Sequence, residues 1–208
     1  MYKTFKWLVL WICISGSGLT AWGDVLDLRE AVIQPTPNHP ILSEAAALLR
    51  DEIARRSNIT LAISQGIHLK APVIRIGTAD GLTDPLDKAR IPEGKEGYAL
   101  WVKDSSCVMA IGREDRGALF AAGRLVRLLN LSPGIVQLDG AVQIATAPRY
   151  PLRGIQIGFR DTPNSYDAWT TEQFEQHVRD MILFGANAVE LIPSLDPNLI
   201  DGNAMKRT

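Results

Sequence analysis

The stretch that decides the fold runs from residue 150 to residue 192 and reads YPLRGIQIGFRDTPNSYDAWTTEQFEQHVRDMILFGANAVELI. It starts with an apolar run, Leu152–Phe159, and ends with a second one, Ala186–Ile192. Between the two, residues 170–173 (TTEQ) have the form of a capping box, and apolar residues follow at helical spacing as far as Gly185. A strand, a loop, a helix and a second strand in this order form the repeating unit of parallel α/β folds.

The predicted helix of this unit, Thr170–Phe184, has one apolar face, formed by Phe174, Val178, Met181 and Ile182. We expect this face to pack on the two strands, against Ile155, Ile157 and Val189. A parallel strand pair with a single crossover leaves much apolar surface bare, so the unit is expected to need neighbours on both sides.

Before residue 148, segments of two kinds alternate, and they predict a separate α+β domain over residues 24–147. Helical spacing indicates helices at Ile41–Arg56 and Asp115–Leu129, with Asp115 as N-cap and residues 133–134 (Pro-Gly) as the stop. β-Branched runs bounded by Gly, Pro and Asn predict the strands Ala31–Gln34, Ile59–Ile63, Val73–Ile76, Tyr98–Val102 and Cys107–Ile111, the last two as a hairpin. We predict an α+β sandwich, with both helices on one face of a mainly antiparallel sheet.

Composition excludes several classes of protein. The 208 residues are 46% hydrophobic and 22% charged, as in folded proteins, and the formal net charge of −1 offers no attraction to nucleic acid. Two cysteines exclude a disulfide scaffold, and three scattered histidines argue against a histidine metal site. No cofactor or metal is predicted. Cys107, in an apolar run, is expected to be a buried, inert thiol.

The first 23 residues have the features of an export signal. Lys3 and Lys6 precede the uncharged apolar run Trp7–Ile14, and small residues lead to Gly23. The run is too short to span a bilayer, which takes about 20 residues. We expect cleavage after Gly23, a mature charge of −3, no stable membrane span, and a secreted or periplasmic protein. The alternative is an uncleaved membrane anchor.

Several short motifs carry a resemblance to known enzymes. Before the junction they are residues 74–77 (IRIG), 96–98 (EGY), 111–112 (IG) and 117–125 (GALFAAGRL); at the junction they are residues 150–156 (YPLRGIQ) and 185–190 (GANAVE). With these motifs the chain resembles the front part of exported family-20 β-hexosaminidases and family-67 α-glucuronidases. In those enzymes a small α+β domain precedes a (β/α)8 barrel, and an Arg-Gly pair enters the first barrel strand.

The resemblance implies that residues 148–208 are the first β–α–β unit of such a barrel. A (β/α)8 barrel takes about 250 residues, whereas 58 residues follow Tyr150, so the expectation is a truncated barrel. In family-20 enzymes the paired catalytic acids lie after the fourth barrel strand. The catalytic residues are therefore unknown from this sequence.

Barrel enzymes bind substrate at the carboxyl ends of their strands. That rule selects Arg160 and Asp161 after the first strand and Glu190 near the end of the second. By resemblance, Arg160 takes the place of the arginine with which family-20 enzymes hold the sugar; the alternative is an arginine that fixes the loop by pairing with Asp161 or Asp167. Glu190 is either a substrate ligand or one partner of a salt bridge inside the barrel.

The loop between the first strand and the helix adds aromatic and acidic candidates. Tyr166, Asp167 and Trp169 together offer flat rings beside a carboxylate, a combination typical of carbohydrate sites. Trp169 has an alternative role as a staple that packs on Phe174 at the start of the helix. The acidic loop residues could equally be turn formers, so a catalytic pair made of Asp161 and Asp167 is disfavoured. His177 is expected to be structural.

Two functions follow from these observations. The chain is either the amino-terminal portion of an exported glycoside hydrolase that acts in glycan breakdown, or a non-catalytic carbohydrate-binding or accessory protein. In both cases the expected partner is an oligo- or polysaccharide.

Overall fold

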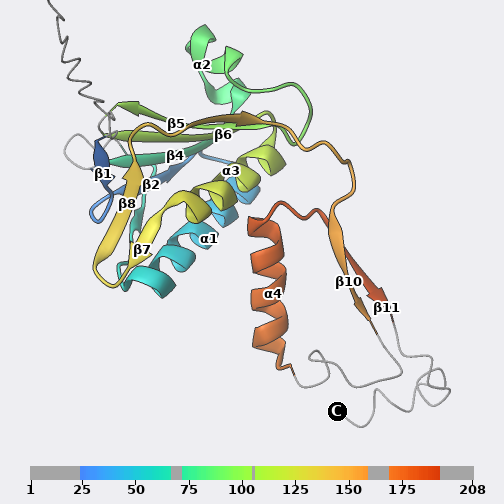
Figure 1. Ribbon diagram of the computed structural model, residues 1–208. Coiled ribbons are helices and arrows are strands. Elements are labelled where there is room, and N and C mark those ends of the chain that lie inside the picture. Colours follow the sequence, from blue (N-terminus) through green and yellow to red (C-terminus); the bar gives the residue numbers. More distant parts are fainter. Residues whose placement is uncertain (1–23, 67–71, 105, 159–168, 193–208) are drawn as a thin grey trace, which may run out of the picture.

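A mixed six-stranded sheet is the centre of the molecule (Figure 1). The computed structural model describes residues 24–66, 72–104, 106–158 and 169–192. Within them the sheet has the order β3-β2-β4-β6-β5-β9. Its strands are β2 (Val32–Pro35), β3 (Ala62–Ile63), β4 (Val73–Thr78), β5 (Tyr98–Asp104), β6 (Cys107–Gly112) and β9 (Gln143–Thr146).

The prediction of a mainly antiparallel sheet is wrong. Strands β3, β2, β4 and β6 are mutually parallel, and β5 and β9 alone run antiparallel to their neighbours. The predicted hairpin of β5 and β6 is confirmed. Its antiparallel pairing does not continue from β6 to β4, because those two strands are parallel. The continuous apolar run of β6 belongs to a strand covered on both faces, which is typical of parallel sheets.

Both predicted helices of the α+β domain are present, as α1 (Pro40–Ser57) and α3 (Asp115–Leu128). They pack against each other on one face of the sheet, as predicted (Figure 1). The main hydrophobic core lies between these helices and the strands. The other face is covered by η1 (Ala79–Gly81) and α2 (Pro85–Ala89), where Leu82 and Ile91 pack with Trp101, Met109 and Ile111 in a second core. This second layer was not predicted.

A small antiparallel sheet, β1-β8-β7, flanks the helices. Its strands are β1 (Val25–Asp27), β7 (Asn130–Ser132) and β8 (Ile135–Asp139). The Pro133-Gly134 pair predicted to stop the second helix instead connects β7 to β8, with Gly134 at a φ of 78°. Glycine favours such a turn because a left-handed backbone costs it little.

The strand–helix–strand unit of residues 150–192 has the predicted order: β10 (Gly154–Gly158), α4 (Thr171–Leu183) and β11 (Ala188–Ile192). The two strands are parallel, with Gly154 opposite Ala188. The capping box is confirmed, because Thr170 and Gln173 exchange both hydrogen bonds. The apolar run Ala186–Ile192 predicts a buried strand, but Val189 and Leu191 of β11 are 41% and 71% exposed. The barrel itself stays a prediction.

Helix α4 packs mainly on α3 of the α+β domain, which corrects the expected packing on β10 and β11. Leu183 is 2% exposed and belongs to the main core, and Ile182 packs against that core. On the side of α1, Gln176 donates a hydrogen bond to the buried Glu52 at 3.1 Å. In the view of Figure 1, α4 accordingly stands between the helix layer and the β10–β11 pair. The unit shares a core with the domain before it.

The close contact between α3 and α4 depends on the absence of a side chain at Gly123. A Cβ at this position would lie 2.7 Å from the carbonyl oxygen and 2.8 Å from the Cα of Leu183, closer than such atoms approach. Glycine to alanine inside a helix normally stabilises by about 1 kcal/mol. We expect Gly123→Ala to lower the melting temperature instead, and to speed proteolysis within residues 169–192, because α4 must move away.

The matched control is Arg124→Ala, one position along the same helix. This variant should leave the protease resistance of residues 169–192 unchanged. A Gly123→Ala protein more stable than the parent would show that the two helices are not in close contact.

Candidate functional site

Four of the six residues predicted to bind substrate lie outside the described residues: Arg160, Asp161, Tyr166 and Asp167. Trp169 is described, and it precedes α4. Its ring lies edge-on to Phe174, with centroids 5.3 Å apart, and to His177, with centroids 5.0 Å apart. This is the geometry expected of a staple at the start of a helix.

Glu190, the sixth predicted residue, is exposed on β11. It lies opposite Gln156 of β10, and the Gln156 side-chain amide donates a 2.9 Å hydrogen bond to its carboxylate. Within the described residues, Glu190 is thus bonded to a neutral amide, whereas the salt-bridge alternative requires a cation. A substrate contact by Glu190 stays a prediction.

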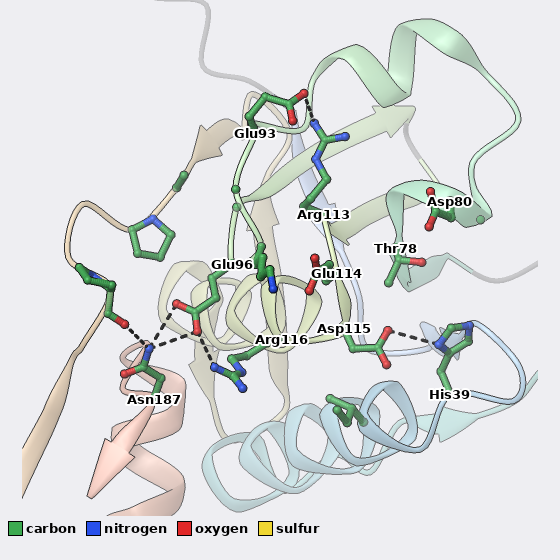
Figure 2. A pocket seen from close by; sticks show the side chains of 18 of the residues that line it. His39, Thr78, Asp80, Glu93, Glu96, Arg113, Glu114, Asp115, Arg116 and Asn187 are labelled. Atoms are coloured by element: carbon green, nitrogen blue, oxygen red, sulfur yellow. Dashed lines mark hydrogen bonds and ion pairs between the residues drawn. The ribbon is translucent and has the colours of Figure 1, made fainter.

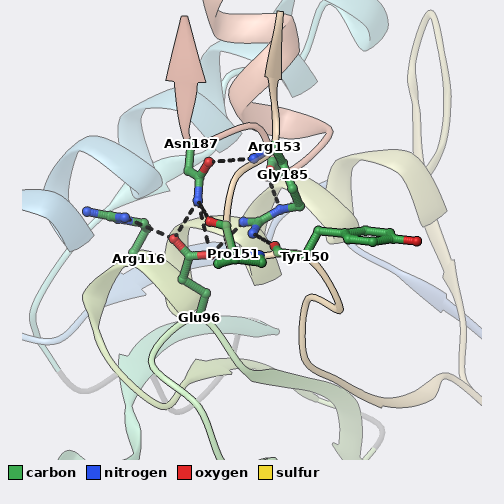
Figure 3. Close-up of polar contacts among 7 residues, drawn as sticks. All are labelled: Glu96, Arg116, Tyr150, Pro151, Arg153, Gly185 and Asn187. Carbon is green, nitrogen blue, oxygen red and sulfur yellow. Dashed lines mark hydrogen bonds and ion pairs between the residues drawn. The ribbon is translucent and has the colours of Figure 1, made fainter.

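A polar cluster joins the strand–helix–strand unit to the α+β domain, and Glu96 is at its centre (Figure 3). We call Glu96, Arg116, Arg153 and Asn187 the junction cluster. The Glu96 side chain is 14% exposed, and its two carboxylate oxygens accept hydrogen bonds from Arg153 at 2.6 Å and Arg116 at 2.9 Å. The Asn187 amide donates to the same carboxylate at 3.2 Å. Charge-assisted hydrogen bonds of this kind are among the strongest in proteins.

The other contacts of the cluster connect the starts of β10 and β11. Arg153 donates to the carbonyl oxygens of Gly185 at 2.9 Å and Tyr150 at 2.7 Å, and its guanidinium lies 5.2 Å from the centre of the Phe120 ring. The Asn187 side chain accepts from the Arg153 backbone N–H at 2.9 Å. The Arg-Gly, Gly-Ala-Asn and Glu-Gly motifs that carry the family resemblance therefore meet here, in a structural role.

The protonation of Glu96 follows from these contacts. Burial raises the pKa of this carboxyl, but hydrogen bonds from Arg116, Arg153 and Asn187 outweigh that effect and hold the pKa below its ordinary value. The carboxylate is therefore charged at neutral pH and paired with two arginines.

An open cleft of about 1040 Å³ lies beside the junction cluster (Figure 2). On one side it is lined by residues at the carboxyl ends of the parallel strands: Thr36, Thr78, Asp80, Gly81, Arg113 and Glu114. On the other side it is lined by the loop Glu93–Gly97, by Pro151 and by Asn187 just before β11. Open α/β sheets bind ligands outside the carboxyl ends of their parallel strands, so this cleft is the second candidate site.

Two contacts between side chains, one of them an ion pair, hold the walls of the cleft. Arg113 pairs with Glu93 at 2.9 Å and also donates to the carbonyl oxygen of Ile91 at 2.6 Å. Asp115 lies 3.2 Å from the His39 ring, across the amino-terminal ends of α3 and α1. The sequence predicted Asp115 as N-cap, but Glu114 occupies that position and its side chain makes no capping hydrogen bond. The cleft was not predicted, since its walls come from segments far apart in the sequence.

Neither a metal site nor a reactive thiol emerges in the described ranges. Across residues 24–66, 72–104, 106–158 and 169–192, no three His, Cys, Asp or Glu side chains are grouped so that they could hold a metal ion. Burial raises the pKa of the half-buried Cys107 thiol, which disfavours the reactive thiolate. Among the helices described, none is long and apolar enough to cross a membrane.

Comparison with known proteins finds likeness in structure alone. No protein-family model and no curated protein sequence matches the chain. Among solved structures, a GH115 4-O-methyl-α-glucuronidase with specificity for decorated arabinogalactans aligns with a TM-score of 0.58 and 15% identity. The GH20 β-N-acetylhexosaminidase from Streptomyces coelicolor A3(2) aligns with a TM-score of 0.55 and 20% identity.

The alignments cover most of this chain and a small part of each neighbour. They extend over 81% and 78% of this chain but only 26% and 30% of the two enzymes. At these identities the likeness shows the fold, a mixed α/β arrangement that occurs in glycoside hydrolases. One neighbour belongs to family 20, as the motifs indicated, and the other is an α-glucuronidase of family 115, where the motifs indicated family 67.

The junction cluster predicts a pH-dependent contact between the two parts of the chain. Glu96→Gln removes the charge from both ion pairs, and we expect a loss of roughly 1.5–3 kcal/mol of stability at pH 7, typical of hydrogen bonds to charged groups. The folded pKa of Glu96 is lowered, so its contribution is complete above the unfolded pKa of about 4.3. It disappears as the pH falls through the folded value.

The measurement is the melting temperature of parent and variant at pH 7 and at pH 3. The difference between them should be larger at pH 7 than at pH 3. Glu93→Gln, at an exposed ion pair, is the control and should change stability little at either pH. A difference for Glu96→Gln that is equal at both pH values would contradict the role assigned to this carboxylate.

Proposed function

We propose that the chain is the amino-terminal portion of an exported glycoside hydrolase, which hydrolyses O-glycosyl bonds in glycan breakdown. The observation that carries the proposal is that the two solved structures named above are glycoside hydrolases and that their alignments cover about four fifths of this chain. The order of an α+β domain followed by a strand–helix–strand unit, joined by the junction cluster, agrees with the motifs of the sequence.

In this proposal the two parts of the chain have different tasks. Residues 24–147 form a supporting domain, and residues 148–208 begin a (β/α)8 barrel. Substrate is bound beyond the carboxyl ends of β10 and β11, by residues that include Arg160, Asp161, Tyr166, Asp167, Trp169 and Glu190. The catalytic acids are unassigned, since the resemblance places them after a fourth barrel strand.

The junction cluster supports the binding of substrate by orienting the strands. Arg153 and Asn187 hold the starts of β10 and β11 to each other and to Glu96. The direction of the two strands, and with it the position of their carboxyl ends, follows from these contacts. Side chains that bind a sugar must be held in place by such supporting contacts.

Export is the second part of the proposal. Residues 1–23 are removed as a signal peptide, and the mature protein is secreted or periplasmic. The amino-terminal sequence of the exported protein, expected to begin at Asp24, checks this step.

The gene tests the proposal most directly. We expect the DNA that follows the codon for Thr208 to continue in the same reading frame and to encode further strand–helix units. A stop codon at that point would overturn the proposal and leave the alternative of a carbohydrate-binding or accessory protein.

An activity assay gives an independent prediction. The purified 208-residue chain should not hydrolyse aryl glycosides, because the proposal places the pair of acids that glycoside hydrolysis requires on later barrel strands. Turnover that is lost when Glu190 is changed to Gln would contradict this, and would place catalysis on the strands described here.

A further inference from the structure

A second pocket, of about 160 Å³, lies where α3 and β5 meet the residues that follow α4. Tyr98, Phe120 and Arg127 line it from the α+β domain. Arg153 and Phe184 line it from the strand–helix–strand unit. We call this pocket the arginine pocket. Because both parts of the chain contribute side chains to it, a ligand bound there contacts both.

Arg127 brings a positive charge to the arginine pocket, and no carboxylate among the described residues neutralises it. The half-buried side chain donates from Nε to the carbonyl oxygen of Gly123 at 3.3 Å, and its terminal nitrogens have no acceptor in the described part of the chain. Burial lowers the pKa of Arg127; the nearby Tyr98 opposes this shift, and Arg124 adds to it. A half-buried cation without a counter-ion is unfavourable, so an anion is stabilised there.

The surroundings of Arg127 are free of competing acids. No Asp or Glu is among the described residues that line the pocket. Arg153, the other cation in the lining, is already paired with Glu96 at 2.6 Å. Arg124 lies one turn before Arg127 on α3 and forms no ion pair with the residues described. The negative end of the α3 dipole compensates part of this charge but offers no hydrogen bond to the terminal nitrogens of Arg127. The pocket therefore attracts anions.

Phe120 and Phe184 give the same pocket apolar walls. The guanidinium of Arg127 lies over the Phe184 ring at 4.9 Å from its centre, and that of Arg153 lies over the Phe120 ring at 5.2 Å. Stacking on a ring leaves the edge of a guanidinium available, and this edge binds a carboxylate through two parallel hydrogen bonds. The pocket is smaller than the roughly 300–1,000 Å³ of pockets for drug-sized ligands, so it suits a single ring rather than an oligosaccharide.

From these observations we infer that the arginine pocket binds a small monocarboxylate with a flat apolar body, such as an aromatic acid. The terminal nitrogens of Arg127 hold the carboxylate, and the Tyr98 phenol is a further donor. The ring lies against Phe120 and Phe184. The inference goes beyond the proposed hydrolase and does not depend on it, since every residue that it uses belongs to the described structure.

The test is a titration of the ¹⁵N-labelled 208-residue chain with benzoate and, separately, with benzamide, its neutral counterpart of the same shape. We expect benzoate to shift the side-chain Nε–H signal of Arg127 and the backbone signal of Gly185, while the signal of Glu190 stays in place. Benzoate should bind at least tenfold more tightly than benzamide, because the pocket selects the charge. It should also raise the melting temperature, since a ligand that binds the folded state alone stabilises it.

Two variants separate the hydrogen bonds of one arginine from the general positive charge. Arg127→Gln should weaken the binding of benzoate at least tenfold. Arg124→Gln removes the same charge one turn away on the same helix, and should weaken it less than threefold. With the parent protein, acetate should bind at least threefold more weakly than benzoate, because it has no ring to lie against the phenylalanines.

Several results would overturn the inference. They are the absence of benzoate binding to the parent, equal affinities for benzoate and benzamide, and undiminished binding by Arg127→Gln. Tighter binding of inorganic phosphate, or of N-acetylaspartate N-methylamide as a mimic of an acidic side chain, would also reject it in favour of a phosphate or a protein segment. The titration with the parent decides the matter even where a variant fails to fold. None of these results bears on the proposed hydrolase, which the reading frame after Thr208 decides.

Discussion

One carboxylate, that of Glu96, holds the two parts of this chain together. It lies in the loop before β5, and its partners come from α3, from the residue before β10 and from the residue before β11. A largely buried carboxylate must be neutralised, and two arginines and an amide satisfy it here. Because Arg153 and Asn187 also bind each other and nearby carbonyl groups, the starts of both parallel strands are fixed relative to the sheet of the α+β domain.

Apolar packing adds a second connection between the same parts. Leu183 enters the main core, and the missing side chain at Gly123 lets α4 rest on the backbone of α3. A strand–helix–strand unit on its own would leave much of its apolar surface bare, and here the helix buries its apolar residues on the α+β domain. The consequence is that β10 and β11 leave Val189 and Leu191 exposed to solvent in the described structure.

The same arrangement separates the two candidate sites. One lies beyond the carboxyl ends of β10 and β11, and the other lies in the cleft at their opposite ends, where the carboxyl ends of β2, β4 and β6 meet the first turn of α3. The junction cluster stands between them. Its contacts fix the starts of β10 and β11 and so set the direction of these strands. Three of its residues, Glu96, Arg116 and Asn187, also form part of the wall of the cleft.

The local features of this protein can be predicted from its sequence, whereas the way they meet depends on contacts in the tertiary structure. The bounds of α1, α3 and α4, the capping box at Thr170 and the hairpin of β5 and β6 were predictable, because periodicity, caps and turns act within a few residues. The parallel direction of β2, β4 and β6, the packing of α4 on α3 and the cleft at Thr78 were not predictable. Each depends on residues tens of positions apart, such as Glu96 and Asn187, whose contact no local pattern encodes.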